Sequence, residues 1–201
     1  MAAEALTMEL EWVYTNDDAL QFVDSFKAVM DSSLCPDTHV PNLVLDCRTV
    51  LKRVLDRADL LRELLSTLLR MEARRIVSCL VALGLYTSEY GVAEPLNNAM
   101  REGDVRMVKK LTPLLRDLSA LLEALPRVKT LTFRGEKHLP RELRGDTITF
   151  CSFLSASNEL NASLGFVSGS GRFGTVFFVQ GCSGRYELFV ESCCAWINFI
   201  K

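Results

Sequence analysis

The sequence is poor in the residues from which metal sites, disulfide frameworks and membrane spans are built. Its two histidines, His39 and His138, have no partner at ligand spacing, so we expect no metal. Seven cysteines make an odd number and include no Cys-x-x-Cys pair, which indicates mostly reduced thiols packed as small core residues. The chain also lacks an apolar run long enough to cross a bilayer, so we expect no membrane partner.

Neither sign of charge is in marked excess. The chain has 23 Lys and Arg residues against 25 Asp and Glu residues, a formal net charge of −2, which gives no reason to expect a nucleic-acid partner. Residues 1–12 include Glu4, Glu9 and Glu11 and no basic residue, whereas a secretory signal begins with positive charge. We therefore expect a cytoplasmic protein with reduced cysteines.

The sequence does contain enough apolar residues for an ordinary globular core. With 201 residues, 49% of them hydrophobic and 24% charged, it suits one domain or one domain with an appendage. Helical periodicity dominates up to Leu125, and short β-branched and aromatic runs dominate after Pro126, which predicts an α+β fold. The expected helices span residues 12–30, 47–70, 72–83, 92–101, 112–125 and 158–166, and the expected strands span 128–133, 147–153, 175–180, 186–190 and 195–200.

The expected helix over residues 47–70 has the clearest apolar stripe in the chain. One interpretation is that the stripe binds a partner, and the other is that it packs on the protein's own core. We favour the core, because most helical stability comes from packing an apolar face within the fold. The stripe consists of Val50, Leu51, Val54, Leu55, Ala58, Leu61, Leu65, Leu68 and Leu69, and Gly84 is expected to cap the helix that follows.

Some patterns resemble sites but favour a simpler explanation. Residues 169–174 match G-x-G-x-x-G, yet they follow a helix and precede a strand, the reverse of the dinucleotide-binding order, so we expect a loop. No Gly-x-Ser-x-Gly sequence supports a serine-hydrolase triad. Arg74-Arg75 and Lys109-Lys110 are expected to be solvated faces of helices.

Two strand ends in the second half of the chain carry residues suited to ligand binding. Arg134 and Gly135 follow the first expected strand; a guanidinium holds phosphate through paired hydrogen bonds, and glycine lets a flat ligand approach the backbone. Ser155 and Ser157 follow the second expected strand. Taken alone, Ser155 is better explained as a hydroxyl that satisfies its own backbone.

These residues belong to a longer series of motifs between residues 76 and 189. In order, the series comprises Tyr86-Thr87 with the helix after it, the leucine-rich helix that ends at Pro126, Phe133-Arg134-Gly135, Ser155-Ala156-Ser157 after an aromatic strand, the helix containing Ala162 and Phe166, and a strand over 175–179. The series resembles the arginine-specific mono-ADP-ribosyltransferase family, that is, the NAD(P)(+)–arginine ADP-ribosyltransferases.

The resemblance implies a fold and an activity. The fold would be a helical N-terminal region at residues 1–75, followed over 76–201 by the split β-sheet core of an ADP-ribosyltransferase. The activity would be transfer of ADP-ribose from NAD, as co-substrate, to an arginine of a protein acceptor, with release of nicotinamide. Arg134 would hold the pyrophosphate, Gly135 the nicotinamide amide and Ser155 the nicotinamide ribose. Arg134 and Ser155 are the implied catalytic residues, and Ser157 and Phe166 would complete the NAD pocket.

One family motif has no counterpart, the Glu-x-Glu that follows a serine on a late strand. If Ser192 matches that serine, residues 197–199 are where its glutamates are expected, and those residues are Ile-Asn-Phe. Glu187 and Glu191 precede the serine and cannot be equated with them. We therefore expect a core that is incomplete at its C-terminal end, with weak or absent turnover.

Three functions remain open from the sequence. The first is ADP-ribosyl transfer to protein arginine, by a carboxylate that the motifs do not identify. The second is binding of NAD or ADP-ribose by a relative without activity. The third is a helical protein-interaction module built on the 47–70 stripe. The acceptor protein and the oligomeric state are not predicted.

Overall fold

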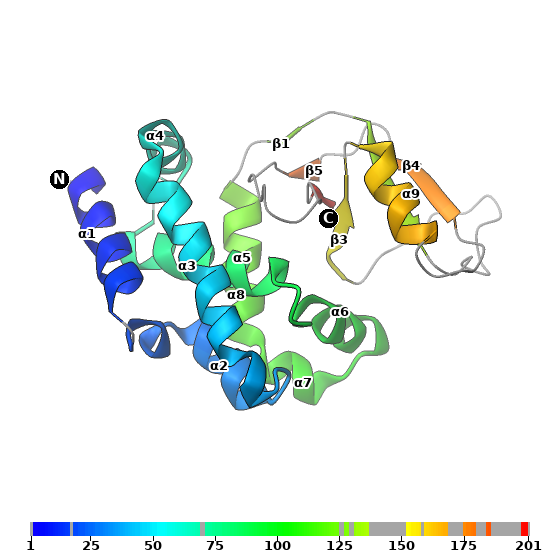
Figure 1. Ribbon diagram of the computed structural model, residues 1–201, viewed down its shortest axis with the longest axis horizontal. Helices are drawn as coiled ribbons and strands as arrows, with labels where there is room; N and C mark the ends of the chain where they lie inside the picture. Colours follow the sequence, from blue (N-terminus) through cyan, green and yellow to red (C-terminus); the bar gives the residue numbers. More distant parts are fainter. Residues whose placement is uncertain are drawn as a thin grey trace. The chain divides into compact units, whose positions relative to one another are not determined.

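The computed structural model describes residues 2–16, 18–68, 71–124, 127–128, 131–136, 152–157, 159–168, 175–179, 184–185 and 198–200. The chain forms two compact units, Met1–Leu125 and Pro126–Lys201 (Figure 1). The first unit is helical and the second combines strands with a helix, so the predicted α+β class is confirmed. The helical unit extends through Leu125, whereas the resemblance implied a boundary after residue 75.

Helix α5 (Ala73–Thr87) is the central helix of the first unit. It contacts α1, α2, α3 and α8, which explains why its residues from Ile76 to Tyr86 are buried, except for half-buried Ser78. A helix that is apolar on nearly every side must lie inside a core, and α5 does. The elements around it are α1 (Ala2–Thr15), η1 (Ala19–Phe22), α2 (Asp24–Ser32), η2 (Asp37–His39), α3 (Val40–Asp56), α4 (Ala58–Thr67), α6 (Ala93–Glu102), α7 (Val105–Lys110) and α8 (Thr112–Ala124).

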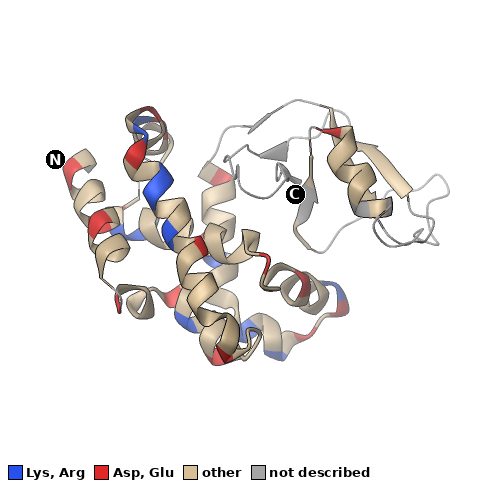
Figure 2. Cartoon of the chain, in the orientation of Figure 1, with Lys and Arg blue, Asp and Glu red and all other residues tan. Residues whose placement is uncertain are grey.

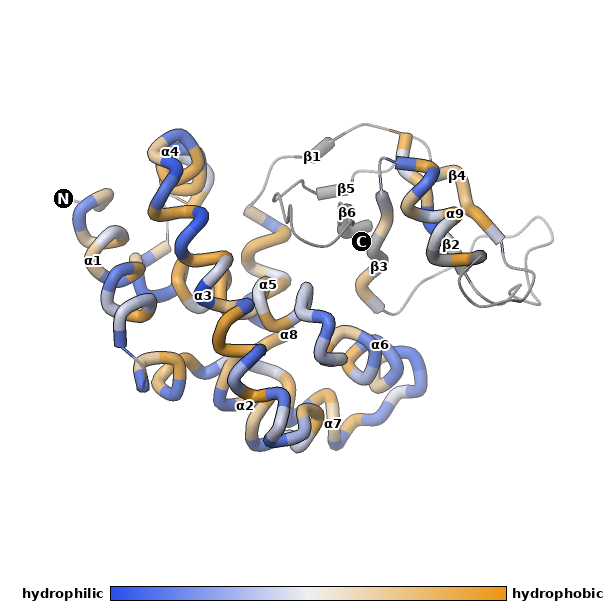
Figure 3. The backbone as a smooth tube through the Cα atoms, in the orientation of Figure 1, coloured by the Kyte–Doolittle hydropathy of each residue, from blue (hydrophilic) through white to orange (hydrophobic). Residues whose placement is uncertain are grey.

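The exposed sides of these helices carry charged residues, although α1 also exposes Met8 and Trp12 and α3 exposes Leu45. Figure 3 shows apolar segments on the inner sides of α3, α5 and α8, and Figure 2 shows acidic and basic residues of both signs intermixed over the helices. This amphipathic arrangement is what the helical periodicity of the sequence predicts. No described helix is both long enough and apolar enough to span a membrane.

Gly84 lies inside α5 rather than after it, so its predicted role as a helix cap is wrong. A Cβ at this position would stand 2.8 Å from the Cα of Cys47 in α3. The two helix backbones therefore approach each other more closely than any side chain larger than hydrogen would allow. The requirement for glycine comes from packing between helices, and periodicity within one helix does not reveal it.

The helix predicted over residues 47–70 is two helices, because α3 ends and α4 begins at Arg57, whose backbone is extended (φ −122°, ψ 94°). In α3 the stripe is buried in the protein's own core, as predicted, at Val50, Leu51 and Val54. The break at Arg57 changes which side of the following helix faces the core. In α4, therefore, Leu64, which the predicted stripe did not include, is buried, while Leu65, which it did include, is only half-buried.

This change of phase makes a direct prediction for adjacent residues. Leu64→Asp should lower the free energy of unfolding by at least ~3 kcal/mol, because it removes a buried leucine and buries an unpaired carboxylate. Leu65→Asp should cost much less, since half-exposure lets the carboxylate reach water. Thermal denaturation followed by circular dichroism measures both. Equal losses in the two variants would contradict the observed register of α4.

The helices predicted over residues 92–101 and 112–125 are confirmed as α6 and α8, and a further short helix, α7, lies between them in the sequence. Helix α6 ends at Gly103, which has φ +69°, a conformation that favours glycine. Asp104 then begins α7, and its Oδ1 accepts a hydrogen bond from the Met107 backbone N–H at 3.0 Å. Helix α8 begins at Thr112-Pro113, as proline in the first turn predicts.

The second unit contains short antiparallel strands. Strand β2 (Thr132–Glu136) pairs with β4 (Thr175–Val179). A further sheet has the order β1-β5-β6-β3, comprising β1 (Arg127–Val128), β5 (Gly184–Arg185), β6 (Asn198–Ile200) and β3 (Leu154–Ala156). Helix α9 (Leu160–Ser168) contacts β2 and β4.

The predicted strands are confirmed in part. The strand over 175–180 and the helix over 158–166 are observed as β4 and α9. The strand predicted over 128–133 is split between β1 and β2. Of the strand predicted over 195–200, residues 198–200 are observed as β6, and residues 195–197 lie outside the described residues. Of the strand predicted over 147–153, residues 152–153 lie just before β3 and are not part of it. Residues 147–151 lie outside the described residues. The same holds for the strand predicted over 186–190 and the loop predicted over 169–174.

Candidate functional site

The predicted ligand-binding residues lie on β2, on β3 and at the start of the segment that leads to α9. Arg134 and Gly135 are in β2, opposite Phe177 and Val176 of β4. Ser155 is in β3, opposite Phe199 of β6. On its other side, β2 is joined to the end of β3 by an isolated antiparallel bridge between Phe133 and Ser157.

The bridge brings the two strand ends together through two backbone hydrogen bonds. The Phe133 N–H donates to the Ser157 carbonyl at 2.6 Å, and the Ser157 N–H donates to the Phe133 carbonyl at 2.8 Å. In an antiparallel register counted from this pair, Arg134 is level with Ala156 and Gly135 with Ser155. Segments about twenty residues apart in the sequence therefore present their predicted site residues at adjacent positions.

The Arg134 side chain lies on the more buried face of β2. Side chains alternate along a strand, so Arg134 shares a face with Thr132, which is 4% exposed. Phe133 is on the other face, where its ring meets that of Phe178 edge to face at 5.3 Å and Phe178 is 65% exposed. The guanidinium group thus starts from a partly buried position, and the Arg134 side chain is half-buried.

Two hydroxyl groups near this site are buried without a hydrogen-bond partner among the described residues, namely Thr132 Oγ1 and Ser152 Oγ. Buried polar atoms are nearly always paired in native proteins, so each such atom calls for a water, an ion or a ligand group. Ser157 differs, because its buried Oγ accepts a hydrogen bond from the Glu159 N–H at 3.0 Å. This contact shapes the turn into α9, and the hydroxyl can still donate.

Phe166 is placed only by its backbone, in α9, which contacts β2. The side chains of Phe166 and Ser155 lie outside the described part of the structure, as do His138 and the whole of Ser192, Glu187 and Glu191. The structure thus brings Arg134, Gly135, Ser155 and Ser157 together at the level of the backbone.

The first unit contains a second polar cluster, centred on Asp117 of α8. Asp117 is fully buried, and its Oδ1 accepts a hydrogen bond from Arg116 Nε at 3.1 Å and forms an ion pair with Arg75 Nη1 at 2.9 Å. Its Oδ2 accepts from Ser78 Oγ at 2.6 Å and from Ser25 Oγ. The carboxylate therefore joins α2, α5 and α8, and both of its oxygens accept hydrogen bonds.

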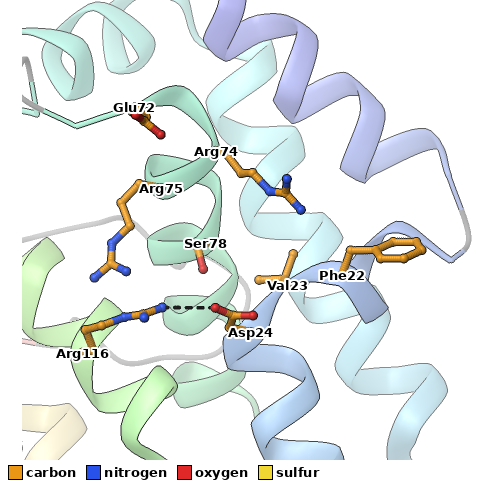
Figure 4. A pocket seen from close by; sticks show the side chains of 8 residues that line it. All are labelled: Phe22, Val23, Asp24, Glu72, Arg74, Arg75, Ser78 and Arg116. Atoms are coloured by element: carbon orange, nitrogen blue, oxygen red, sulfur yellow. Dashed lines mark ion pairs between the residues drawn. The ribbon is translucent and has the colours of Figure 1, made fainter.

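A cavity of about 300 Å³ lies beside this cluster (Figure 4). Arg75 and Ser78 extend into it from α5 and Arg116 from α8, and a dashed line joins Arg116 to Asp24 at the start of α2. Burial opposes the charge of Arg116, but its hydrogen bonds to Asp117 and Asp24 outweigh this effect and raise its pKa. The lining is completed by Phe22, Val23, Glu72 and Arg74.

The prediction that Arg74-Arg75 is a solvated helix face is wrong for Arg75, whose guanidinium is paired with a buried carboxylate. A signal for this cluster was present in the sequence. Asp117 follows Leu114 by three residues and precedes Leu121 by four, so it lies on the apolar face of α8. A carboxylate at a core position requires a partner, although the sequence does not say which.

The described cysteines are unsuited to nucleophilic chemistry. Cys35, Cys47 and Cys79 are free and buried, which agrees with the prediction of reduced core thiols. Burial, reinforced by the nearby Asp117 carboxylate, raises the pKa of Cys79 to about 12, and burial raises that of Cys47 further. A thiol is a nucleophile only as the thiolate, so neither is reactive near pH 7.

Comparison with known proteins adds no identification. No protein-family model, no curated protein and no solved structure matches the chain. Within the described ranges, no group of three or more His, Cys, Asp or Glu residues is arranged to hold a metal ion. Any function must therefore be argued from the two polar sites themselves.

Proposed function

We propose that the second unit binds NAD at the junction of β2 and β3, and that its relation to the ADP-ribosyltransferases is one of binding with weak or absent transfer. The supporting observation is the Phe133–Ser157 bridge, which brings Arg134 and Gly135 level with the Ser155-Ala156-Ser157 segment. The family motifs require this juxtaposition, and no sequence argument fixes it.

Each residue at the junction has a chemical part in this proposal. The Arg134 guanidinium, starting from a partly buried position, would pair with the pyrophosphate of NAD. Gly135 would let the nicotinamide amide approach the backbone, and Ser155 would bond the nicotinamide ribose. Thr132 Oγ1, which is buried without a partner in the described part of the chain, is a further group that a polar ligand would satisfy. Ser157 and Phe166 would border the nicotinamide.

Transfer itself would break the N-glycosidic bond between nicotinamide and ribose, leaving an oxocarbenium-like ribose. In the family this cation is stabilised by the Glu-x-Glu motif, and an arginine of a protein acceptor takes the ADP-ribose. Residues 197–199 of this chain are Ile-Asn-Phe. We therefore propose NAD binding as the main function and only slow transfer of ADP-ribose to protein arginine. We propose that the protein acts in the cytoplasm.

The interaction-module alternative is weakened by the burial of the α3 part of its stripe. Val50, Leu51 and Val54, which would have formed the partner-binding stripe, are buried in the protein's own helical core. They are therefore not free to contact a partner. We do not propose that function.

Replacing Arg134 tests the NAD site. Arg134→Ala should weaken NAD binding by about one to two decades, since a hydrogen bond to a charged group is worth roughly 1.5–3 kcal/mol. Arg134→Lys should restore little, because an ammonium group cannot form the paired contacts of a guanidinium. Isothermal titration calorimetry with NAD measures the affinities.

Arg106→Ala is the matched control, because Arg106 is an exposed arginine of α7 in the other unit. It should bind NAD like the original chain. Unchanged affinity in Arg134→Ala would remove Arg134 from the site, and absence of NAD binding in the original chain would refute the proposed function.

A further inference from the structure

The cavity beside Asp117 is lined by more arginines than carboxylates, a feature that is independent of the proposed NAD site. Three guanidinium groups line it, those of Arg74, Arg75 and Arg116, and its two lining carboxylates are Asp24 and Glu72 (Figure 4). We propose that this cavity is a binding site for a phosphate group, either free phosphate or a small phosphomonoester. Guanidinium groups suit this ligand because their planar N–H donors match the phosphate oxygens.

Two of the arginines are already held in position. Asp117 forms an ion pair with Arg75 and accepts a hydrogen bond from Arg116, and Ser25 and Ser78 donate hydrogen bonds to its other oxygen. A guanidinium has five N–H donors, so this anchoring leaves several for a ligand. Side chains that are fixed before binding lose less conformational entropy when the ligand arrives.

The third arginine is unpaired. Arg74 is exposed, and within the described residues it forms neither an ion pair nor a hydrogen bond. It extends from the first turn of α5 toward Phe22 and Val23 (Figure 4). It can therefore turn to a ligand without breaking an existing contact.

Two helices begin at the cavity, and neither has a side-chain cap. Val23 and Glu72 are the N-cap residues of α2 and α5, and neither makes a side-chain capping hydrogen bond. A helix N-terminus carries roughly half a positive charge and unpaired N–H groups, which favour anions. These partial charges add to the arginines and outweigh the carboxylates of Asp24, Glu72 and Asp117.

One existing ion pair must be exchanged on binding. Arg116 Nη2 is 3.5 Å from Asp24 Oδ2, and the two side chains are 47% and 69% exposed. Exposed pairs of this kind contribute little to stability, so a phosphate can replace Asp24 as the partner of Arg116 at small cost. Asp24 therefore acts as a competitor for the site, and its removal should favour the ligand.

The opposite wall of the cavity is apolar. Phe22 and Val23 lie across from Arg75 and Arg116 (Figure 4), and Phe22 is 62% exposed, with its ring 6.3 Å from that of Trp12. Aromatic surface of this kind suits an apolar or planar group attached to the phosphate. The volume of about 300 Å³ is at the lower end of the range for small-molecule sites.

Calorimetric titration with inorganic phosphate and with phenyl phosphate, at low salt, tests the proposal on the full chain. Both should bind, and more weakly as salt is added. Tighter binding of phenyl phosphate would assign the site to phosphomonoesters, and equal binding would assign it to free phosphate. Failure of both to bind at millimolar concentration would overturn the proposal.

Point variants test whether the phosphate binds in this cavity. Arg74→Ala should weaken it about tenfold while leaving the thermal melt unchanged, because Arg74 supports no other described contact. Asp24→Asn should tighten it several-fold by removing the competitor. Arg106→Ala should have no effect, because Arg106 is an exposed arginine of α7 that does not line the cavity. Loss of phosphate binding in Arg134→Ala, or unchanged binding in both Arg74→Ala and Asp24→Asn, would show that the phosphate binds elsewhere.

Discussion

Asp117→Ala should lower the free energy of unfolding by about 3–5 kcal/mol, the range found when one partner of a buried ion pair is removed. The Asp117 side chain is 0% exposed, accepts hydrogen bonds from Ser25, Ser78 and Arg116, and forms an ion pair with Arg75. Without it, the buried Ser25 hydroxyl and the half-buried Ser78 hydroxyl lose their acceptor, and the Arg75 guanidinium is left against an empty space. The corresponding fall in melting temperature is on the order of 10–20 °C for a unit of this size.

Asp117→Asn separates the charge from the shape of this side chain. The amide retains an acceptor oxygen, and the serine hydroxyls can rotate to accept from its NH₂ group, so the loss should be clearly smaller than for alanine. Asp56→Ala is the matched control, because Asp56 pairs with Lys52 at 3.1 Å but is 59% exposed. An exposed pair of this kind should cost no more than ~1 kcal/mol.

Denaturation by urea, followed by circular dichroism, measures all three variants on one scale. The expected order of loss is Asp117→Ala, then Asp117→Asn, then Asp56→Ala. An Asp117→Ala variant as stable as Asp56→Ala would mean that the cluster does not hold α2, α5 and α8 together.

The 201-residue chain should show little ADP-ribosyl transfer even if it binds NAD. Binding depends on groups that contact the ground state, which in our proposal are Arg134, Gly135 and Ser155. The ribosyl cation exists only on the way to products, so the groups that stabilise it raise the rate without being needed for affinity. Loss of one such electrostatic group commonly costs about a hundred- to a thousand-fold in rate. Neither expected glutamate is found in place.

The test compares this chain with one extended by a Ser-x-x-x-x-Glu-x-Glu segment, using radiolabelled NAD and an arginine-rich acceptor protein. The extended chain should transfer label faster by two or more orders of magnitude while NAD affinity stays similar. Arg134→Ala in the extended chain should abolish the gain. Equal, robust transfer by both chains would mean that an unidentified carboxylate serves the reaction.

Several features of the protein follow from local sequence alone. The end of α6 at Gly103, the capping of α7 by Asp104 and the start of α8 at Thr112-Pro113 each depend on the conformational preference of one or two residues. The β-branched and aromatic run of β4 is likewise a local signal. Such features are predictable because the residues that cause them lie within a few positions of the structure they produce.

Other features were decided only when distant segments met. Gly84 could be recognised as a packing residue only with Cys47 of α3 against it, and the apolar phase of α4 only with the break at Arg57 in place. The single helix predicted over residues 12–30 is wrong, because the chain there forms the end of α1, the short helix η1 and then α2 from Asp24, and most of α1 was not predicted. In each case a contact or a break outside the helical pattern overrode the local preference.

The same division applies to the candidate sites. The residue types at positions 134, 135, 155 and 157 suggested a ligand-binding function, but the Phe133–Ser157 bridge, which makes them neighbours, is a pairing across the sheet. The partners of Asp117 come from three helices, up to 92 positions apart in the sequence. Local sequence determines which residues can bind a ligand. Tertiary packing determines which of them meet, because it selects the few long-range contacts that bury apolar surface and leave no buried charge unpaired.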